Sequence, residues 1–184
     1  RPIIRKIESP VNQPVREKTV LTDEQCDTLL QTLVDKGQYE KACFVALALF
    51  SGRRKAELLR FKVSYFTDEN IIYGSLYKTP EKVLTKGRGG GKMLTCYVLS
   101  KPFKPYFDLW MEERKKKGIE SEWLFPNPED LSKARSISAV NSWANTFSNI
   151  LGVPWYAHAC RHRFTTALSR SGIPDNVIKE IVGW

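Results

Sequence analysis

The chain is poor in the residues that build metal centres and disulfide frameworks. It holds only two histidines among 184 residues, and its four cysteines are widely spaced without any Cys-x-x-Cys pair. This spacing does not indicate a zinc knuckle or a disulfide framework. The scattered carboxylates give poor support to a two-metal nuclease. We therefore expect no metal, no cofactor, and four reduced, semi-buried thiols: Cys26, Cys43, Cys96 and Cys160.

Long apolar runs and nucleotide-binding loops are missing as well. No uninterrupted apolar run, that through residues 43–50 included, is long enough to cross a bilayer, and no signal-peptide pattern opens the chain. The glycine-rich stretch 86–92 fails the pattern Gly-x4-Gly-Lys-Ser/Thr, because Lys86 and Met93 stand where Gly and Ser or Thr are required. We expect an intracellular protein that has no membrane partner and no phosphate-binding loop of this type.

The charge balance is strongly basic. Twenty-nine Lys and Arg residues against twenty Asp and Glu residues leave a formal charge of +9. Such a surplus favours a polyanionic partner through electrostatic steering and counterion release, and nucleic acid is the leading candidate. A basic balance can also serve solubility alone. The length of the chain and its 42% hydrophobic content fit one well-buried domain.

The pattern of apolar residues and chain breakers predicts a mainly α fold with one small antiparallel β-sheet insert (α+β). Residues 1–20 carry three prolines among basic residues and are interpreted as a linker or arm from an upstream domain. A capping box at Thr22 and Gln25 opens a helix, and Gly52 closes a second helix that begins near Tyr39. A third helix is expected just beyond Gly52. The insert covers residues 63–99, with a hairpin tip at 86–92. Further helices are predicted over 103–117, 138–151, 158–170 and 175–182.

The first chemically informative box is Ser51-Gly-Arg-Arg-Lys-Ala-Glu-Leu-Leu59. Arg54 and Glu57 are three residues apart, so both can lie on one helix face, where Glu57 can hold Arg54 in place. A guanidinium matches two phosphate oxygens and stays charged, which suits the stabilisation of a phosphoryl transition state. An ordinary surface Arg-Glu pair is the alternative. The neighbouring cations Arg53, Lys55 and Arg60 are interpreted as phosphate contacts or as a solvated face.

The second box is Ala157-His-Ala-Cys-Arg-His-Arg-Phe164. His158 and Arg161 are three apart on one predicted helix face, which sets a proton-exchanging imidazole beside a permanent cation. The other histidine, His162, points about 100° away around the helix and is expected to stay outside the site.

Three motifs follow one another along the chain: Gly-x-Arg-x-x-Glu-Leu, His-x-x-Arg about a hundred residues later, and Gly-Trp at the end. Together they resemble the catalytic domain of the tyrosine recombinases, also called phage integrases. The resemblance spans nearly the whole chain. It implies that fold, with Arg54, Arg161 and Trp184 binding the scissile phosphate and His158 handling protons. Trp184 stands where most members have histidine and some have tryptophan. Its indole can donate one hydrogen bond but cannot shuttle a proton, and a hydrophobic helix end is the alternative reading.

The family also carries a hairpin lysine, thought to protonate the leaving 5′ oxygen. Lys86 is the first choice because it opens a Lys-Gly tip before the returning strand, and Lys78 and Lys92 remain alternatives. Burial near the phosphate could lower the pKa of such a lysine toward usefulness as an acid. Arg53, Arg88 and Lys92 are expected to contact DNA.

The resemblance implies a site-specific recombinase that breaks and rejoins DNA through a 3′-phosphotyrosine, for integration or excision of a mobile element or phage. Its partner would be a double-stranded recombination site, bound as a homotetramer, in a bacterial or phage-encoded cytoplasmic, nucleoid-associated setting. The fragment itself could be a monomer. No tyrosine follows Tyr156, so we expect residues 21–184 to be a C-terminally incomplete catalytic domain that is inactive alone. A silent DNA-binding module and a type IB topoisomerase are the alternatives.

Overall fold

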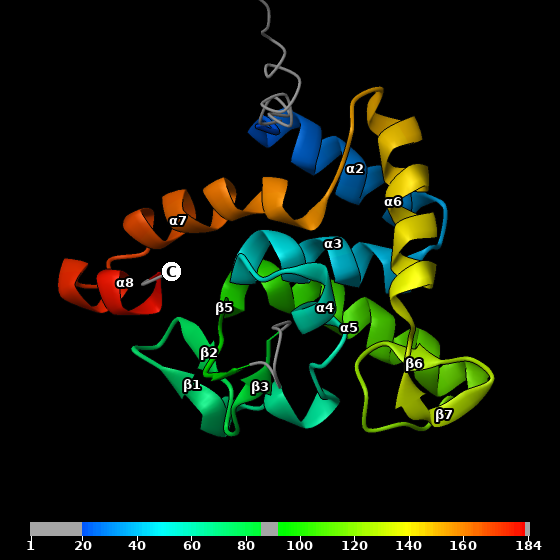
Figure 1. The fold of residues 1–184 in the computed structure, drawn as a ribbon, viewed down its shortest axis with the longest axis horizontal. Coiled ribbons are helices and arrows are strands. Elements are labelled where there is room, and N and C mark those ends of the chain that lie inside the picture. The colour runs from blue at the N-terminus through cyan, green and yellow to red at the C-terminus, as the bar shows by residue number, and fades with distance from the viewer. Residues whose placement is uncertain (1–19, 86–91, 183–184) are drawn as a thin grey trace, which may run out of the picture.

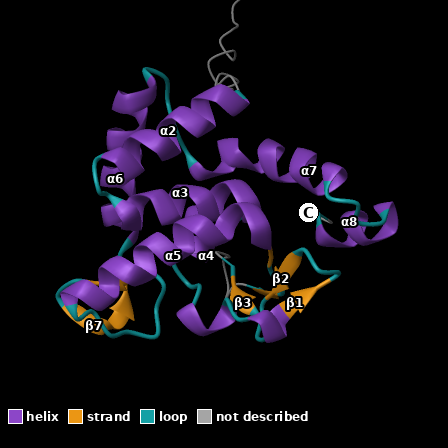
Figure 2. Ribbon diagram, turned by 180° about the vertical axis from the view of Figure 1, so that it is seen from behind, coloured by secondary structure: helices purple, strands orange, loops and turns teal. Residues whose placement is uncertain are grey.

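The fold is organised around one buried helix. A computed structural model of the protein describes residues 20–85 and 92–182. Helix α3 (Tyr39–Ser51) is apolar on all sides, and every residue from 42 to 51 is buried, as expected for a helix with no solvated face. Helices α2 (Asp23–Asp35), α5 (Ser100–Lys117) and α7 (Arg161–Arg170) pack against it. Figure 1 shows α3 in the middle of the molecule, and Figure 2 shows the same arrangement from behind.

The predicted ends of the first two helices are confirmed. The Thr22 hydroxyl accepts the amide of Gln25, and the Gln25 side chain accepts the amide of Thr22, so α2 begins with a capping box. Helix α3 ends at Gly52, whose φ of +65° is the left-handed conformation that favours glycine. All four cysteines are free and buried, a deeper burial than the sequence suggested.

The remaining helices are close to their predicted ranges, with two corrections. Helices α6 (Ile137–Leu151) and α8 (Asp175–Ile181) agree to within one residue. Helix α5 begins three residues earlier than predicted, because Pro102 falls in the first turn, where no backbone N–H is needed. The helix expected after Gly52 is a single turn, α4 (Lys55–Leu58). In the described ranges, no helix combines the length and apolar composition that a bilayer span requires.

The predicted insert contains two small antiparallel sheets. Strands β1 (Ile71–Ile72), β2 (Leu76–Lys78) and β5 (Tyr97–Leu99) pair in the order β1-β2-β5. Strands β3 (Val83–Leu84) and β4 (Met93–Leu94) form the expected hairpin stem. Two 3-10 turns, η2 (Val63–Tyr65) and η3 (Asp68–Asn70), precede β1.

A second β region makes the prediction of one insert wrong. Strands β6 (Pro126–Asn127) and β7 (Asp130–Ala134) form a hairpin between α5 and α6. The sequence signal was weak because β6 begins with a proline and β7 is almost wholly exposed, so its residues show no apolar alternation.

Aromatic contacts fix the site-bearing segments to α3. The Phe44 ring lies 5.3 Å from that of Phe125, 5.5 Å from Trp143 and 6.3 Å from Trp155, measured between centroids. Each such pair contributes about 0.5–1.5 kcal/mol beyond the burial of its area. Phe125 precedes β6, Trp143 lies on α6, and Trp155 directly precedes residues 156–158. One core side chain therefore sets the positions of three segments that are distant in sequence.

Candidate functional site

Gly52 allows the two sequence boxes to meet. A Cβ atom added to Gly52 would lie 2.7 Å from Cδ2 of Phe164, a distance that real Cβ atoms do not tolerate. Gly52 stands two residues before Arg54, and Phe164 stands three residues after Arg161. The close approach of this backbone to the Phe164 ring therefore brings the first arginine box against the second.

Glu57 organises the first box from a buried position. Its side chain is 3% exposed, and its Oε1 atom accepts the backbone N–H of Arg54 at 3.1 Å. The same carboxylate forms an ion pair with Arg53, at 3.8 Å from Nη1. The expected pairing of the Glu57 and Arg54 side chains is therefore corrected: Glu57 holds the backbone of Arg54 and pairs with the guanidinium of Arg53.

This arrangement gives the two adjacent arginines different environments. The Arg53 side chain is only 11% exposed and turns toward Glu57. Arg54, the N-terminal cap residue of α4, has an extended backbone and is exposed. Arg54 is thus the cation of this box that an incoming anion can reach.

The second box begins as a 3-10 turn. The predicted helix over 158–170 is divided into η5 (Ala157–Cys160) and α7, with His158 on the turn and Arg161 as the first residue of α7. His158 is exposed and Arg161 is half-buried. His162 is exposed and is not among the described residues that line the cavity described below.

The two boxes are electrostatically coupled through Arg161. Burial, followed by the guanidinium groups of Arg53 and Arg54, lowers the pKa of Arg161 to about 10, and the carboxylate of Glu57 opposes this shift. Arg161 therefore lies near both arginines of the first box and stays charged at neutral pH. Three cations held this close repel one another, and a bound anion would relieve that repulsion.

A cavity of about 870 Å³ opens between the boxes. Arg54 and His158 both line it, so the structure brings together these two predicted site residues. Arg161 is not among the described residues that line the cavity. The remaining lining residues include three cations and, among the described residues, no carboxylate: Lys55, Ala56, Leu59, Arg60, Ala134, Arg135, Ser136, Ile137, Tyr156 and Ala157. Among the described residues, the charged groups that a ligand would meet in this cavity are therefore cations.

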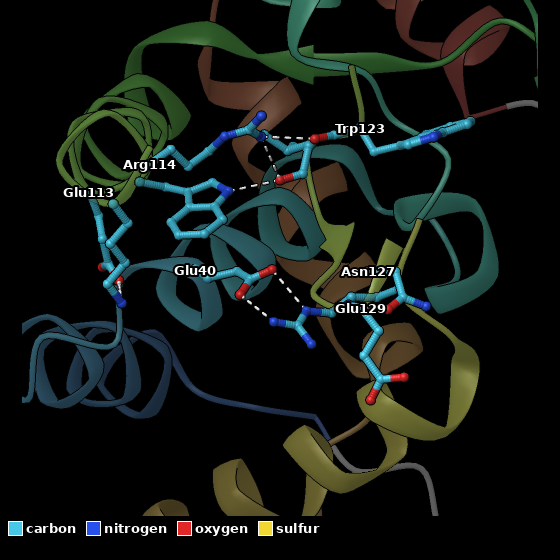
Figure 3. A network of polar contacts seen from close by, with 10 residues as sticks. Glu40, Glu113, Arg114, Trp123, Asn127 and Glu129 are labelled. Atoms are coloured by element: carbon cyan, nitrogen blue, oxygen red, sulfur yellow. Dashed lines mark hydrogen bonds and ion pairs between the residues drawn. The ribbon is translucent and has the colours of Figure 1, made fainter. Parts of the chain in front are cut away.

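Arg135 is a cavity cation that the sequence analysis did not identify. Two of its guanidinium nitrogens donate to the Glu40 carboxylate at 2.8 and 2.9 Å, and its Cζ atom lies 4.9 Å from the ring centroid of Trp143. Figure 3 shows Glu40 reaching this guanidinium. Arg135 follows β7 directly, so its position became visible only once that hairpin was known. A sequence signal was present in Ser136, which caps α6.

The segment that leads to β6 is held by a buried arginine. Arg114 of α5 donates to the carbonyl oxygen of Ser121 at 2.7 Å. It also donates to the carbonyl oxygens of Trp123 and Leu124, at 2.8 and 3.3 Å (Figure 3). Trp110 donates to the same Leu124 oxygen at 2.8 Å. These bonds satisfy carbonyl groups that would otherwise be buried without donors, and they fix the route of the chain toward Arg135.

The predicted hairpin residues are only partly described. Lys86, Arg88 and Trp184 lie outside the described residues. The stem is closed by Thr85, whose amide donates to the Lys92 carbonyl at 2.7 Å. Lys92 is exposed beside β4, and Lys78 is exposed at the end of β2. Both alternative lysines are therefore accessible on the β insert.

The functional groups of this site are mainly positively charged side chains. Within residues 20–85 and 92–182, no group of three or more His, Cys, Asp or Glu side chains could hold a metal ion. Preorganised guanidinium groups and an imidazole can instead bind a phosphate and stabilise the charge that develops on it during transfer.

Sequence and structure comparisons relate the chain to known proteins. Residues 19–184 match the phage integrase family. The SPbeta prophage-derived recombinase-like protein YomM of Bacillus subtilis is 30% identical over 146 residues, which cover 74% of this chain and 40% of YomM. The tyrosine recombinase XerH of Helicobacter pylori is 26% identical over 187 aligned positions, covering 95% of this chain and 48% of XerH.

A solved structure shares the fold. The Tn1549 transposon integrase, in complex with circular intermediate DNA, has a TM-score of 0.64 at 16% identity, covering 98% of this chain and 62% of the integrase. This similarity confirms the fold expected from the sequence. The chain spans less than half the length of the two relatives described above.

Proposed function

The chain belongs to the phage integrase family, and from this membership we propose that it is the catalytic domain of a tyrosine site-specific recombinase. It would break and rejoin DNA strands through a 3′-phosphotyrosine intermediate, for the integration or excision of a mobile element or phage. The observation that carries the proposal is the meeting of Arg54 and His158 at one cavity without carboxylates among its described lining residues, with Arg161 electrostatically coupled to Arg54.

In this proposal the arginines bind the scissile phosphate. Arg54 and Arg161 contact its non-bridging oxygens and stabilise the pentacoordinate transition state, and Trp184 adds an indole N–H. Glu57 supports Arg54 through the backbone hydrogen bond described above. Arg88 and Lys92 contact the DNA backbone. Because Arg53 turns toward Glu57, it would act on the phosphate through its electrostatic field more than through direct contact.

Proton transfer falls to His158 and to a lysine of the β insert. His158 accepts the proton of a tyrosine phenol as the phenolic oxygen bonds to phosphorus. The bond from phosphorus to the 5′ oxygen breaks, and the lysine ammonium gives a proton to that oxygen. Lys86 remains our first choice, with Lys78 and Lys92 as alternatives. No step requires a metal or a nucleotide cofactor, because the phosphotyrosine bond conserves the energy of the broken phosphodiester.

The nucleophile is a point on which this sequence departs from the family pattern. No tyrosine follows Tyr156, whereas the family carries its nucleophile after the Gly-Trp position. From the family pattern we propose that the nucleophile is a tyrosine shortly after the Gly-Trp position. Tyr156 lines the cavity and is the residue of this chain that could replace it.

The proposed partner is a double-stranded recombination site. The Tn1549 integrase was solved with DNA, and the net charge of +9 of this chain suits the same partner. We further propose a homotetramer on DNA, a monomeric state for residues 1–184 alone, and an arm at residues 1–20 that leads from an upstream DNA-binding domain. The setting would be the bacterial cytoplasm, at the nucleoid.

A covalent adduct on a nicked recombination-site duplex tests the proposal. The full-length protein should give a protein-DNA band on a denaturing gel, and Arg54→Ala should lower the yield by about 100-fold or more. Arg170→Ala, which changes an exposed arginine at the end of α7, should leave the yield unchanged. Binding without any adduct would favour a silent DNA-binding module. Loss of the adduct in Tyr156→Phe would place the nucleophile inside this chain.

A further inference from the structure

A polar cluster outside the cavity connects the segment that follows the first arginine box to the loop that precedes strand β3. The Tyr65 hydroxyl donates to Oε2 of Glu81 at 2.6 Å, and Nζ of Lys62 lies 3.0 Å from the same oxygen. Tyr65 is on η2, in the segment that follows α4, whereas Glu81 is on the loop between β2 and β3. The cluster therefore joins two segments that carry different parts of the proposed site.

The partners of Glu81 are themselves held in place. Tyr65 is buried, and its ring lies 6.0 Å from that of the fully buried Phe61, in an edge-to-face arrangement. Lys62 also approaches Glu122, at 3.6 Å, and the ring of Trp123, at 5.5 Å from its centroid. The Tyr65 hydroxyl thus projects from a rigid support and gives a fixed point of attachment for Glu81.

Two further contacts hold the same arm of the hairpin. Nη1 of Arg60 donates to the Leu84 carbonyl at 3.0 Å, and Arg60 also lines the cavity with Arg54. Thr79 is bonded to Cys96 in both directions, through its amide and through its hydroxyl oxygen, each at 3.0 Å. Residues 79–85, which we call the hairpin arm, are therefore attached at three places, two of them to the segment 60–65.

The charge of Glu81 strengthens its attachment. The hydrogen bond from Tyr65, followed by that from Lys62, lowers the pKa of Glu81, so it is a carboxylate at neutral pH. Hydrogen bonds to an ionised acceptor are shorter and stronger than neutral ones. The hydrogen bond of 2.6 Å from the hydroxyl of buried Tyr65 therefore indicates that Glu81 attaches the loop and does not serve solubility alone.

We propose that Tyr65 and Glu81 are positioning residues for the proton-transfer step of strand cleavage. They hold the hairpin arm in a constant place relative to Arg54, and through it the lysine of the β insert that protonates the leaving 5′ oxygen. This inference rests on the proposed function. The reaction needs the ammonium within hydrogen-bond reach of that oxygen, and a misplacement of about 1 Å can cost up to about 100-fold in rate.

A change of leaving group separates positioning from general damage. A substrate with sulfur in place of the bridging 5′ oxygen releases a thiolate, and since thiols have a pKa of about 8.5, that group leaves without a proton from the protein. The lysine, and any residue that positions it, is then dispensable. Defects in folding, DNA binding or phosphate stabilisation persist with either substrate.

The test measures the single-turnover adduct rate of the full-length protein on both substrates. Tyr65→Phe keeps the ring and removes only the hydroxyl, and it should slow cleavage about tenfold on the oxygen substrate and less than about twofold on the sulfur substrate. Tyr106→Phe removes a hydroxyl from α5 and should change neither rate. Glu81→Gln keeps an accepting oxygen and should be slowed less than Glu81→Ala.

The outcomes decide between positioning and other roles. Equal slowing of Tyr65→Phe on both substrates, or no slowing on either, would overturn the inference. Amide hydrogen exchange over residues 79–85 gives a readout independent of activity: it should quicken in Tyr65→Phe, and an unchanged rate would also overturn the inference. If the unmodified protein gives no adduct with either substrate, the proposed function itself fails, and the positioning role fails with it.

Discussion

Replacing Arg161 by methionine should make the free protein more stable. The methionine side chain keeps an apolar stem of similar length and removes the charge. Burial and the cations Arg53 and Arg54 lower the pKa of Arg161, which means that its charged form is less stable in the folded chain than in the unfolded chain. At neutral pH the residue is charged in both states, so its charge opposes folding at every pH below about 10.

The size of the effect follows from the two pKa values. The pKa falls from the ordinary value of an arginine to about 10, and a difference of this size corresponds to about 3 kcal/mol. Solvent around a half-exposed side chain screens most of this, which leaves about 1 kcal/mol. For a domain of this length, a gain of about 1 kcal/mol raises the melting temperature by about 2–4 °C. Sites that bind a transition state commonly reduce stability in this way.

Thermal unfolding, followed by circular dichroism, measures the effect. Arg163→Met is the matched control, because Arg163 is paired with Asp23 at 3.2 Å and Asp27 at 3.6 Å, and its loss should lower the melting temperature. Sulfate, which resembles phosphate, should stabilise the unmodified protein more than Arg161→Met. If Arg161→Met melts as low as Arg163→Met, Arg161 is a structural residue and the reasoning is refuted.

Three further outcomes are expected. Gly52→Ala should lower the free energy of unfolding in urea by about 2–4 kcal/mol, because of left-handed strain and the contact at 2.7 Å with the Phe164 ring. Gly152→Ala, where φ is +75° and the space around the new Cβ is open, should lower it by about 1 kcal/mol. Equal losses in the two variants would contradict the close approach. Tyr65→Phe should lower the melting temperature at pH 7. Because the hydrogen bonds from Tyr65 and Lys62 lower the pKa of Glu81, that difference should shrink as Glu81 becomes protonated at acidic pH, and a constant difference would contradict the assigned hydrogen bond. Arg54→Ala should reduce the slope of log affinity for DNA against log salt by about 1, and an unchanged slope would show that Arg54 makes no phosphate contact.

Local signals in the sequence were sufficient for most element boundaries. The capping box of Thr22 and Gln25 and the glycine stop at Gly52 depend on neighbours within four residues, so the chain carries them in every context. The hairpin β6–β7 was missed for the opposite reason. Its strands are stabilised by contacts with residues outside the hairpin, such as the bond from Trp123 to the Ser132 carbonyl at 2.9 Å, and they lack an apolar alternation of their own.

The amino-acid sequence by itself determined the chemical groups of the site and their family. The spacing of Arg54, Glu57, His158 and Arg161 suggested a cationic phosphate site, and the resemblance of the two boxes to the phage integrases made that prediction specific. The tertiary structure decided which groups meet. It turned Arg53 toward Glu57, left Arg54 exposed, and brought Arg135 to the cavity from a hairpin that showed no clear pattern.

The physical reason is the range of the interactions. Periodicity and caps act over one or two helical turns, whereas the contact of Gly52 with the Phe164 ring and the pairing of Glu40 with Arg135 join residues about a hundred positions apart. Such contacts depend on the packed core around α3, where shape and volume, rather than the order of residues along the chain, determine which side chains become neighbours.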